Sequence, residues 1–347
     1  MEMGGLFVKT HFVKKPMQFS VRDVEVEAPE SDEIVVAPRA CGVCGFDVLT
    51  AKFLAEDWMG IGHEVTGEVA EVGTAVRNVA VGDRVVVENS TFCGLCVQCK
   101  RGNVVHCSSM NHYLSPGAFA ERLKVKARAV YPLGDLDFCA GALAEPLTVA
   151  IDMVEAADIP LSGSVVVFGP GPIGLMICRL ALLKGAARVY LTGHAHSEAR
   201  WQAADTIGVT EKLYVDAPGF SLQEYFREHE PQGVDRVLVT SPPATVAEAV
   251  DICRFGGIIA YDGISFDASQ QIVLDGNALH FKRLQLRGVH SVPNLGWPQA
   301  LDLLGRRVID PEVFISQTFP FAEVPEAVRF AADNRKDTVK VMVDFAL

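Results

Sequence analysis

The fold is decided by the stretch VVVFGPGPIG, which runs from Val165 to Gly174. An apolar strand leads into the pattern GxGxxG, and an apolar helical segment follows. In such a strand–loop–helix the glycines permit a tight turn and let the backbone approach a pyrophosphate, whose charge lies at the helix N-terminus. An ordinary strand-to-helix turn is the alternative. We predict a dinucleotide site formed by Gly169, Gly171, Pro172, Ile173 and Gly174.

Outward from this loop, apolar runs alternate with helical segments. We expect strands at 164–168, 188–192, 234–240 and 257–261, and helices at 173–184, 197–207 and 244–254. Strands alternating with helices of this length form right-handed βαβ units on a parallel sheet. The middle of the chain is therefore predicted to be an α/β domain.

The rest of the chain has a different pattern. As far as about Arg128 it is β-rich, with short Val-dense runs at 33–38, 65–72 and 83–88 separated by turn residues. A helix is expected at 297–306. The Val-rich run 338–345 has no βαβ partner after it, so we expect it to return to the first domain.

Composition limits the function classes. At 347 residues with 49% hydrophobic content, the chain can form two cores. The formal charge of −12 argues against nucleic acid or an anionic membrane as a partner. The segment 1–16 lacks the uninterrupted apolar core of a signal peptide, and no apolar run is long enough to span a bilayer. We expect a soluble cytoplasmic protein, in which nine cysteines point to metal or reactive thiols rather than disulfides.

Four of the cysteines form a CxxCxxCx7C pattern. Two-residue gaps let thiolates converge on one tetrahedral Zn²⁺, and four sulfurs with no open position make a structural site. An iron–sulfur cluster uses similar spacing, but nothing else in the sequence suggests electron transfer. We therefore predict structural zinc in a lobe at about 90–110, held by Cys93, Cys96, Cys99 and Cys107.

A second group of residues could hold a catalytic metal. His63 and Glu64 lie beside each other at the start of a strand, while Cys44 and Glu145 could bring a thiolate and a further carboxylate to the same point. Mixed sulfur, nitrogen and oxygen ligands with one open position suit Lewis-acid zinc. Each residue alone is weak, because a His beside a Glu is more often a surface pair.

Together these features resemble the zinc-dependent medium-chain dehydrogenase/reductase family, especially its sorbitol/polyol and threonine dehydrogenase branch. The resemblance covers nearly the whole chain and rests on Cys44 with Asp47, the GHExxGx5G run 62–73, the four-cysteine lobe, Glu145-Pro146 and the glycine loop. It implies that Cys44, His63, Glu64 and Glu145 hold catalytic zinc and that Asp47 orients His63. Cys41 is the alternative thiolate, although the spacing to Asp47 favours Cys44.

The resemblance also implies an architecture and a reaction. Residues 1–152 and 291–347 would form a GroES-like β-barrel catalytic domain, and 153–290 a Rossmann domain with a doubly wound parallel sheet. The reaction would be hydride transfer between NAD or NADP and a small-molecule secondary alcohol or its ketone: a polyol, sugar, cyclitol or amino alcohol. Family members are usually homodimers or homotetramers.

Cofactor choice depends on the end of the second strand of the α/β domain. A carboxylate there would hold the adenosine ribose, but the position is Gly193, followed by His194 and, further on, Arg200. Loss of the carboxylate removes repulsion toward a 2′-phosphate, which His or Arg could bind. The sequence therefore favours NADP, with Gly193, His194 and Arg200 as cofactor residues.

The chain departs from the family at the proton relay. Related alcohol and polyol dehydrogenases usually carry Ser or Thr two residues after the zinc cysteine, and often His three beyond, where this chain has Phe46 and Leu49. A proton rerouted through zinc-bound hydroxide, Glu145 or water is the favoured explanation. An NADPH-dependent reductase of a conjugated C=C bond or an unusual carbonyl is an alternative, as is a non-catalytic redox sensor.

Overall fold

The computed structural model describes residues 6–112 and 117–347. The chain divides into two compact units, and each is described separately below. Unit 1 comprises 1–148, 292–335 and 340–347, and unit 2 comprises 149–291 and 336–339.

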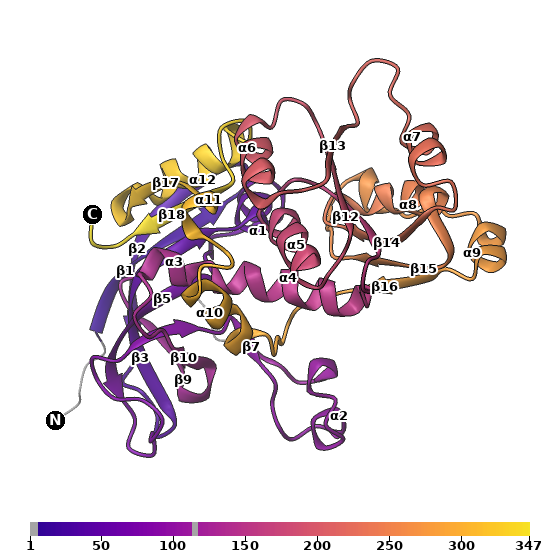
Figure 1. Ribbon diagram of the computed structural model, residues 1–347. Helices are drawn as coiled ribbons and strands as arrows, with labels where there is room; N and C mark the ends of the chain where they lie inside the picture. Colours follow the sequence, from indigo (N-terminus) through magenta and orange to yellow (C-terminus); the bar gives the residue numbers. More distant parts are fainter. Residues whose placement is uncertain (1–5, 113–116) are drawn as a thin grey trace. The chain divides into compact units, whose positions relative to one another are not determined.

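Unit 2 contains a six-stranded, wholly parallel sheet (Figure 1). Its strands follow the order β13-β12-β11-β14-β15-β16. This order places the first strand at the centre with a reversal beside it, which is the doubly wound Rossmann arrangement predicted from the sequence. The strands are β11 (Ser164–Phe168), β12 (Arg188–Gly193), β13 (Glu211–Tyr214), β14 (Val234–Val239), β15 (Cys253–Tyr261) and β16 (Gln285–Gly288).

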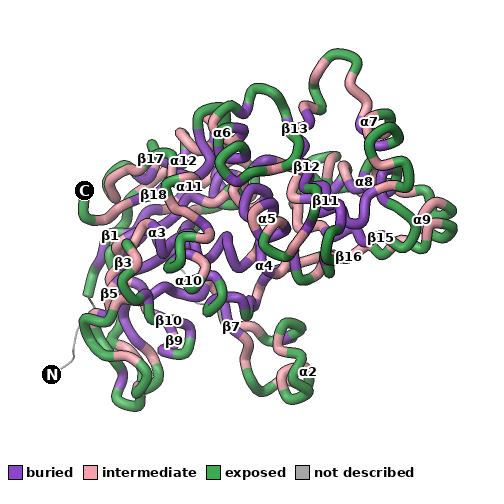
Figure 2. Tube along the Cα trace, viewed as in Figure 1, coloured by how far each residue is buried: buried purple, intermediate pink, exposed green. Residues whose placement is uncertain are grey.

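Strands β11 and β14 lie at the centre of this sheet. Every residue of both strands is buried (Figure 2). Both faces of a central parallel strand are covered, which explains the continuous apolar run 165–168 of β11. Strand β14 also contains two buried charged residues: Asp235 accepts hydrogen bonds from the N–H and Oγ of Ser164, and Arg236 donates to the Asp158 carbonyl. The accompanying helices are α4 (Ala144–Ala157, shared with unit 1), α5 (Pro172–Leu183), α6 (Glu198–Ile207), α7 (Leu222–His229), α8 (Val246–Ile252) and α9 (Gly276–Lys282).

The boundary between helix α8 and strand β15 differs from the prediction. Helix α8 ends at Ile252, and Cys253 already has extended backbone angles and pairs with Val234 of β14. The strand therefore begins four residues before the expected Gly257. The cause is tertiary, because pairing with β14 overrides the helical pattern at the end of α8.

Unit 1 is β-rich, as predicted. Its largest sheet has the order β10-β6-β5-β3-β18-β17, with β9 also paired to β3. A second sheet has the order β2-β1-β4, and β7 pairs with β8. The strands are β1 (Leu6–Lys14), β2 (Gln18–Val26), β3 (Glu33–Val43), β4 (Met59–Gly60), β5 (Glu64–Val72), β6 (Arg84–Val87), β7 (Ser90–Thr91), β8 (Asn111–His112), β9 (Leu123–Lys126), β10 (Val130–Pro132), β17 (Ile315–Pro320) and β18 (Lys340–Asp344).

The C-terminal strand joins this sheet. Strand β18 pairs antiparallel with β3 and parallel with β17, so the tail returns to the first unit as predicted. This pairing sets Lys340 beside Val43 at the end of β3, next to Cys44. The helices of unit 1 are α1 (Gly45–Leu49), the π-helix η1 (Thr50–Leu54), α2 (Val97–Lys100), α3 (Phe138–Ala142), α10 (Trp297–Gly305), α11 (Pro311–Phe314) and α12 (Val324–Asp333), and the chain's short 3₁₀ turns are η2 (Val104–His106), η3 (Ala127–Ala129), η4 (Pro243–Thr245), η5 (Ala268–Gln270) and η6 (Phe321–Glu323).

Within residues 6–112 and 117–347, no helix is both long and apolar enough to cross a bilayer.

Candidate active site and metal centres

Cys44 is positioned by the start of a short helix. It is the N-cap of α1, and its Sγ accepts a hydrogen bond from the Phe46 N–H at 3.4 Å. The Asp47 carboxylate accepts from the Cys44 N–H at 2.9 Å, which completes a reciprocal capping box. Such a box fixes the direction in which the chain enters a helix, so the Cys44 thiol has a defined orientation.

The same Asp47 connects α1 to the segment that carries His63. Its Oδ1 accepts from the Gly62 N–H at 3.0 Å and lies 3.6 Å from His63 Nδ1. Burial alone would raise the pKa of Asp47, but the adjacent imidazole and the two N–H donors lower it. A buried carboxylate facing one ring nitrogen of a histidine is the arrangement that orients a metal-ligating imidazole.

Glu64 is held by a lysine that the sequence analysis did not identify. Lys340 Nζ donates to Glu64 Oε1 and, at 3.2 Å, to the Val43 carbonyl. The side chains of Lys340 and Glu64 are 4% and 1% exposed. Burial alone would lower the pKa of Lys340, but the negative groups Glu64 and Cys44 raise it. Gly42 leaves room for the carboxylate, since a Cβ there would lie 2.0 Å from Glu64 Oε2.

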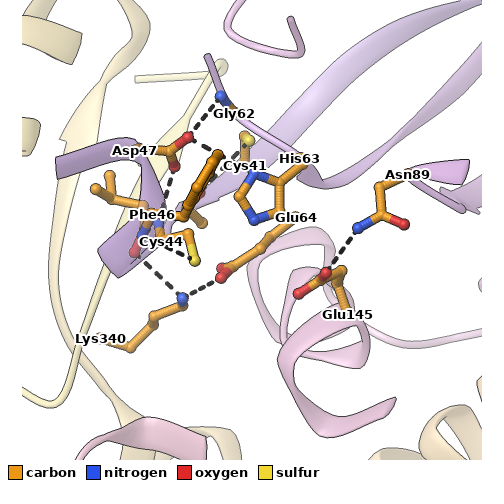
Figure 3. Close-up of polar contacts among 12 residues, drawn as sticks. Cys41, Cys44, Phe46, Asp47, Gly62, His63, Glu64, Asn89, Glu145 and Lys340 are labelled. Atoms are coloured by element: carbon orange, nitrogen blue, oxygen red, sulfur yellow. Dashed lines mark hydrogen bonds and ion pairs between the residues drawn. The ribbon is translucent and has the colours of Figure 1, made fainter. Parts of the chain in front are cut away.

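Three predicted ligands converge (Figure 3). One ligand atom from each of Cys44, His63 and Glu64 lies within 4.8 Å of the others. Glu64 Oε2 is buried and has no hydrogen-bond partner among the described residues. A buried carboxylate oxygen without a partner is costly unless a cation satisfies it. The sulfur, nitrogen and oxygen donors and this orphan oxygen therefore fit a zinc ion, and Cys44 rather than Cys41 belongs to the group.

Glu145 lies apart from this group. It is buried in the first turn of α4, and its Oε1 accepts a hydrogen bond from Asn89 Nδ2 at 2.8 Å (Figure 3). The structure does not include its carboxylate in the three-ligand cluster. Burial raises the pKa of Glu145 to about 7, while His63 acts in the opposite direction. A direct bond from Glu145 to the metal stays a prediction.

The four-cysteine lobe also converges. The Sγ atoms of Cys93, Cys96, Cys99 and Cys107 lie within 4.8 Å of one another. Backbone N–H groups point at these sulfurs, including Cys96 N–H to Cys93 Sγ at 3.3 Å and Ser109 N–H to Cys107 Sγ at 3.4 Å. Hydrogen bonds from backbone N–H groups lower the pKa of Cys93, and lower that of Cys96 to about 5.

Thiolates held by N–H donors are the form that binds zinc. Few apolar side chains could stabilise this lobe without a metal. Leu95 and Val97, between the ligands, are 76% and 64% exposed. The donor set thus fits a closed, structural zinc site.

The glycine loop has the form that a dinucleotide needs. Gly171 is the N-cap of α5, no side chain caps this helix end, and nothing lies within 4 Å of where its Cβ would be. Gly174 packs so closely that a Cβ would lie 2.0 Å from the Gly169 carbonyl oxygen. The open side at Gly171 leaves space for a pyrophosphate next to the N–H groups of Ile173 and Gly174 in the first turn of α5. The close packing explains the third glycine.

At the end of β12, the predicted cofactor residues have partners in unit 2. A Cβ on Gly193 would lie 2.6 Å from the Pro170 ring, so close packing against the glycine loop explains this glycine. Arg200 Nε donates to the Thr338 carbonyl at 3.0 Å. His194 Nδ1 lies 3.6 Å from Asp216 Oδ2.

Sequence reasoning missed three residues of these sites. Lys340 could have been noticed in the sequence, because it is a charged residue in a Val-rich strand. Asp216 follows β13, two residues after its end, and only the neighbouring position of β12 brings it to His194. Asn89 left no signal, since its role depends on a contact with Glu145, 56 residues away.

Comparisons with known proteins agree with this geometry. Residues 30–135 match the profile of the alcohol dehydrogenase GroES-like domain, and 172–306 match that of the zinc-binding dehydrogenase. The chain is 30% identical to a scyllo-inosose 3-dehydrogenase of Thermotoga maritima, over 92% of this chain and 89% of that protein. It belongs to the zinc-dependent medium-chain dehydrogenase family. The predicted family and fold class are confirmed.

Other members of this dehydrogenase family align along almost the entire chain. A sorbitol dehydrogenase of Bacillus subtilis is 27% identical over 96% of this chain and 99% of its own length. A structure described as a short chain alcohol dehydrogenase from E. coli CFT073, complexed with NADH, has a TM-score of 0.88 at 25% identity and covers 98% of this chain and 100% of that one. A zinc-binding dehydrogenase of Sinorhizobium meliloti bound to NADP, itself described as putative, has a TM-score of 0.84 at 26% identity, covering 98% and 99%.

The relay positions of this dehydrogenase are apolar in space as well as in sequence. Phe46 is 42% exposed and Leu49 is partly buried, both on α1 beside Cys44. Neither side chain carries a group that can exchange a proton. The buried carboxylate of Glu64 is paired with the cation of Lys340, whereas that of Glu145 accepts a hydrogen bond from the neutral amide of Asn89.

Proposed function

We propose that this chain is a zinc-dependent NAD(P) oxidoreductase that interconverts a secondary alcohol and its ketone by hydride transfer. The observation that carries the proposal is the convergence of Cys44, His63 and Glu64, with a buried Glu64 oxygen that has no hydrogen-bond partner among the residues that the structure describes. The parallel sheet with its open glycine loop supports the cofactor half of the reaction.

Each residue of the catalytic centre has a defined task. Cys44, His63 and Glu64 would hold zinc, which as a Lewis acid supplies electrophilic stabilisation of the reacting oxygen. Asp47 orients the imidazole of His63, and Lys340 compensates the buried charge of Glu64. These contacts hold the polar side chains of the site in fixed positions.

We propose that Glu145 exchanges the substrate proton in place of the missing relay. Its carboxylate is buried, has no cation partner among the described hydrogen bonds, and is oriented by Asn89. An acid whose pKa is close to neutrality is suited to both accepting and donating a proton near pH 7.

The substrate class we propose is a polyol, sugar, cyclitol or amino alcohol. Relatives named sorbitol dehydrogenase, D-arabinitol dehydrogenase, L-idonate 5-dehydrogenase and scyllo-inosose 3-dehydrogenase support a polyhydroxylated substrate. We further propose a cytoplasmic homodimer or homotetramer, and a preference for NADP, in line with the absent carboxylate at Gly193.

The test is a screen in which zinc-loaded protein is given NAD or NADP together with a polyol, sugar, cyclitol or amino alcohol. Reduction of the cofactor is measured by the absorbance of the reduced nicotinamide. We expect turnover with at least one class, and its loss in Cys44→Ser. Cys178→Ser is the matched control. It is the same substitution at a buried thiol of α5 in unit 2 that belongs to none of the groups of metal-ligating side chains among the described residues. Tight cofactor binding without turnover on the whole panel would contradict the proposal and favour a redox sensor.

Metal analysis separates the remaining alternative. Zinc at both the Cys44 and the four-cysteine centres supports carbonyl chemistry. Zinc at the four-cysteine centre alone, together with reduction of a conjugated C=C bond by NADPH, would favour the reductase alternative, which needs no hydroxyl relay.

A further inference from the structure

A third group of metal-ligating side chains lies in unit 2. His194 and His196 follow β12, and Asp216 follows β13, the neighbouring strand. One ligand atom from each of the three lies within 4.8 Å of the others. The proposed function uses His194 only as a cofactor residue and leaves His196 and Asp216 without a role.

The local chain places the two imidazoles together. His194 and His196 are separated by one residue, and their ring centroids are 5.6 Å apart with planes inclined by 35°. All three side chains are exposed, so an ion from solvent can reach them. Two adjacent histidines repel one another when protonated, whereas both can donate ring nitrogens to one cation when neutral.

The carboxylate is held in place by the backbone. Asp216 Oδ1 accepts a hydrogen bond from the Ala195 N–H at 2.8 Å, and Oδ2 lies 3.6 Å from His194 Nδ1. This N–H belongs to the residue between the two histidines, so the carboxylate is tied to the same loop that carries both rings. A ligand oriented by a backbone hydrogen bond has less freedom to lose when it binds a metal.

We propose that His194, His196 and Asp216 form a third metal site, which takes a divalent transition-metal ion such as Zn²⁺, Co²⁺ or Ni²⁺. Two imidazole nitrogens and one carboxylate oxygen match the ligand preferences of these ions, while Mg²⁺ and Ca²⁺ prefer oxygen alone. With three protein ligands, the ion keeps at least one position for water or another ligand. The site is distinct from the Cys44 and four-cysteine centres, which lie in unit 1.

The experiment is isothermal titration with Ni²⁺, and separately with Mg²⁺, of protein that carries two equivalents of zinc, one for each centre of unit 1, in the absence of cofactor and substrate. We expect one further equivalent of Ni²⁺ and no saturable binding of Mg²⁺. The double variant His194→Ala/His196→Ala should lose Ni²⁺ affinity by more than the roughly tenfold that follows removal of an outer-shell partner. Asp216→Asn should bind more weakly than the parent protein.

Control variants make the result specific. His280→Ala removes an exposed histidine of α9 outside the cluster and should bind Ni²⁺ like the parent. The cluster residues are exposed, so we expect all variants to keep the parent's thermal midpoint and zinc content. The proposal is overturned if no ion binds beyond the zinc complement, or if the double variant keeps parental Ni²⁺ affinity. Neither readout involves turnover, so the result is independent of the proposed reaction.

Discussion

Replacing Lys340 with methionine would remove the positive charge from the buried pair with Glu64 while keeping a side chain of comparable length. Both partners are almost completely shielded from solvent. Removal of one partner of a buried ion pair costs about 3–5 kcal/mol, because the remaining charge is left uncompensated. The upper part of this range applies here, since Glu64 Oε2 already lacks a partner among the described residues.

Zinc should reduce the effect. A cation held by Cys44, His63 and Glu64 compensates the carboxylate that Lys340→Met leaves unpaired. We therefore expect a loss of unfolding free energy in the upper part of the range of about 3–5 kcal/mol in chelator-treated protein and a smaller loss in zinc-loaded protein. Urea titrations of parent and variant in both states, followed by tryptophan fluorescence, measure the difference.

Two further variants identify the cause. Lys340→Arg keeps the charge and should recover most of the stability. Glu64→Gln combined with Lys340→Met removes both charges, so the double variant should be more stable than Lys340→Met alone, which is a coupling measured by a double-mutant cycle. If Lys340→Met matched the parent in both metal states, the argument that Lys340 compensates Glu64 would be refuted.

Four other predictions address the remaining groups. Glu145→Gln should lower kcat by about 10²-fold or more with unchanged cofactor affinity; steady-state kinetics and cofactor titration check this, and an unaltered kcat removes Glu145 from the mechanism. Burial raises the pKa of Glu88 from its ordinary value of 4.5 to about 8. Its contribution to stability is therefore complete below pH 4.5 and is lost as pH rises to about 8, at about 1.4 kcal/mol per unit of pKa shift. Glu88→Gln should match the parent's thermal midpoint near pH 4 and exceed it near pH 9. A lower midpoint near pH 9 would contradict this. Cys99→Ser should lose structural zinc by metal analysis while the Cys44 centre keeps its own, and full zinc content in the variant would argue against the four-cysteine site. The ratio of kcat/KM for NADP and NAD should favour NADP, whereas about a tenfold preference for NAD, or about 1.4 kcal/mol, would exclude a 2′-phosphate site at His194.

Local patterns were sufficient for the large features of the fold. The strand 164–168 and the loop 169–174 needed only apolar continuity and glycine spacing, because a buried parallel strand and a pyrophosphate-binding turn impose these locally. The predicted start of this strand at Gly257 was wrong, because β15 begins at Cys253. Pairing with β14 determines where the strand begins, and the helical pattern of α8 does not reveal it.

The candidate site divides in the same way. Cys44, Asp47, His63 and Glu64 could be recognised because two short segments carry them and because these segments resemble motifs of the dehydrogenase family. The position of Glu145 could not be predicted from the sequence. Its carboxylate accepts a hydrogen bond from the amide of Asn89, which is 56 residues away in the chain.

The sequence by itself identified the candidate residues: the glycine loop, the four-cysteine lobe and the predicted ligands of the second metal centre. Chemistry restricts these positions to a few residue types at short spacings, so they are visible without a fold. Only the tertiary structure showed which charged groups lie beside these residues. Lys340 lies 276 residues from Glu64, and strand β18 brings it beside β3, where a buried carboxylate requires a cation. Asp216 reaches His194 only because β12 and β13 are neighbours in one parallel sheet.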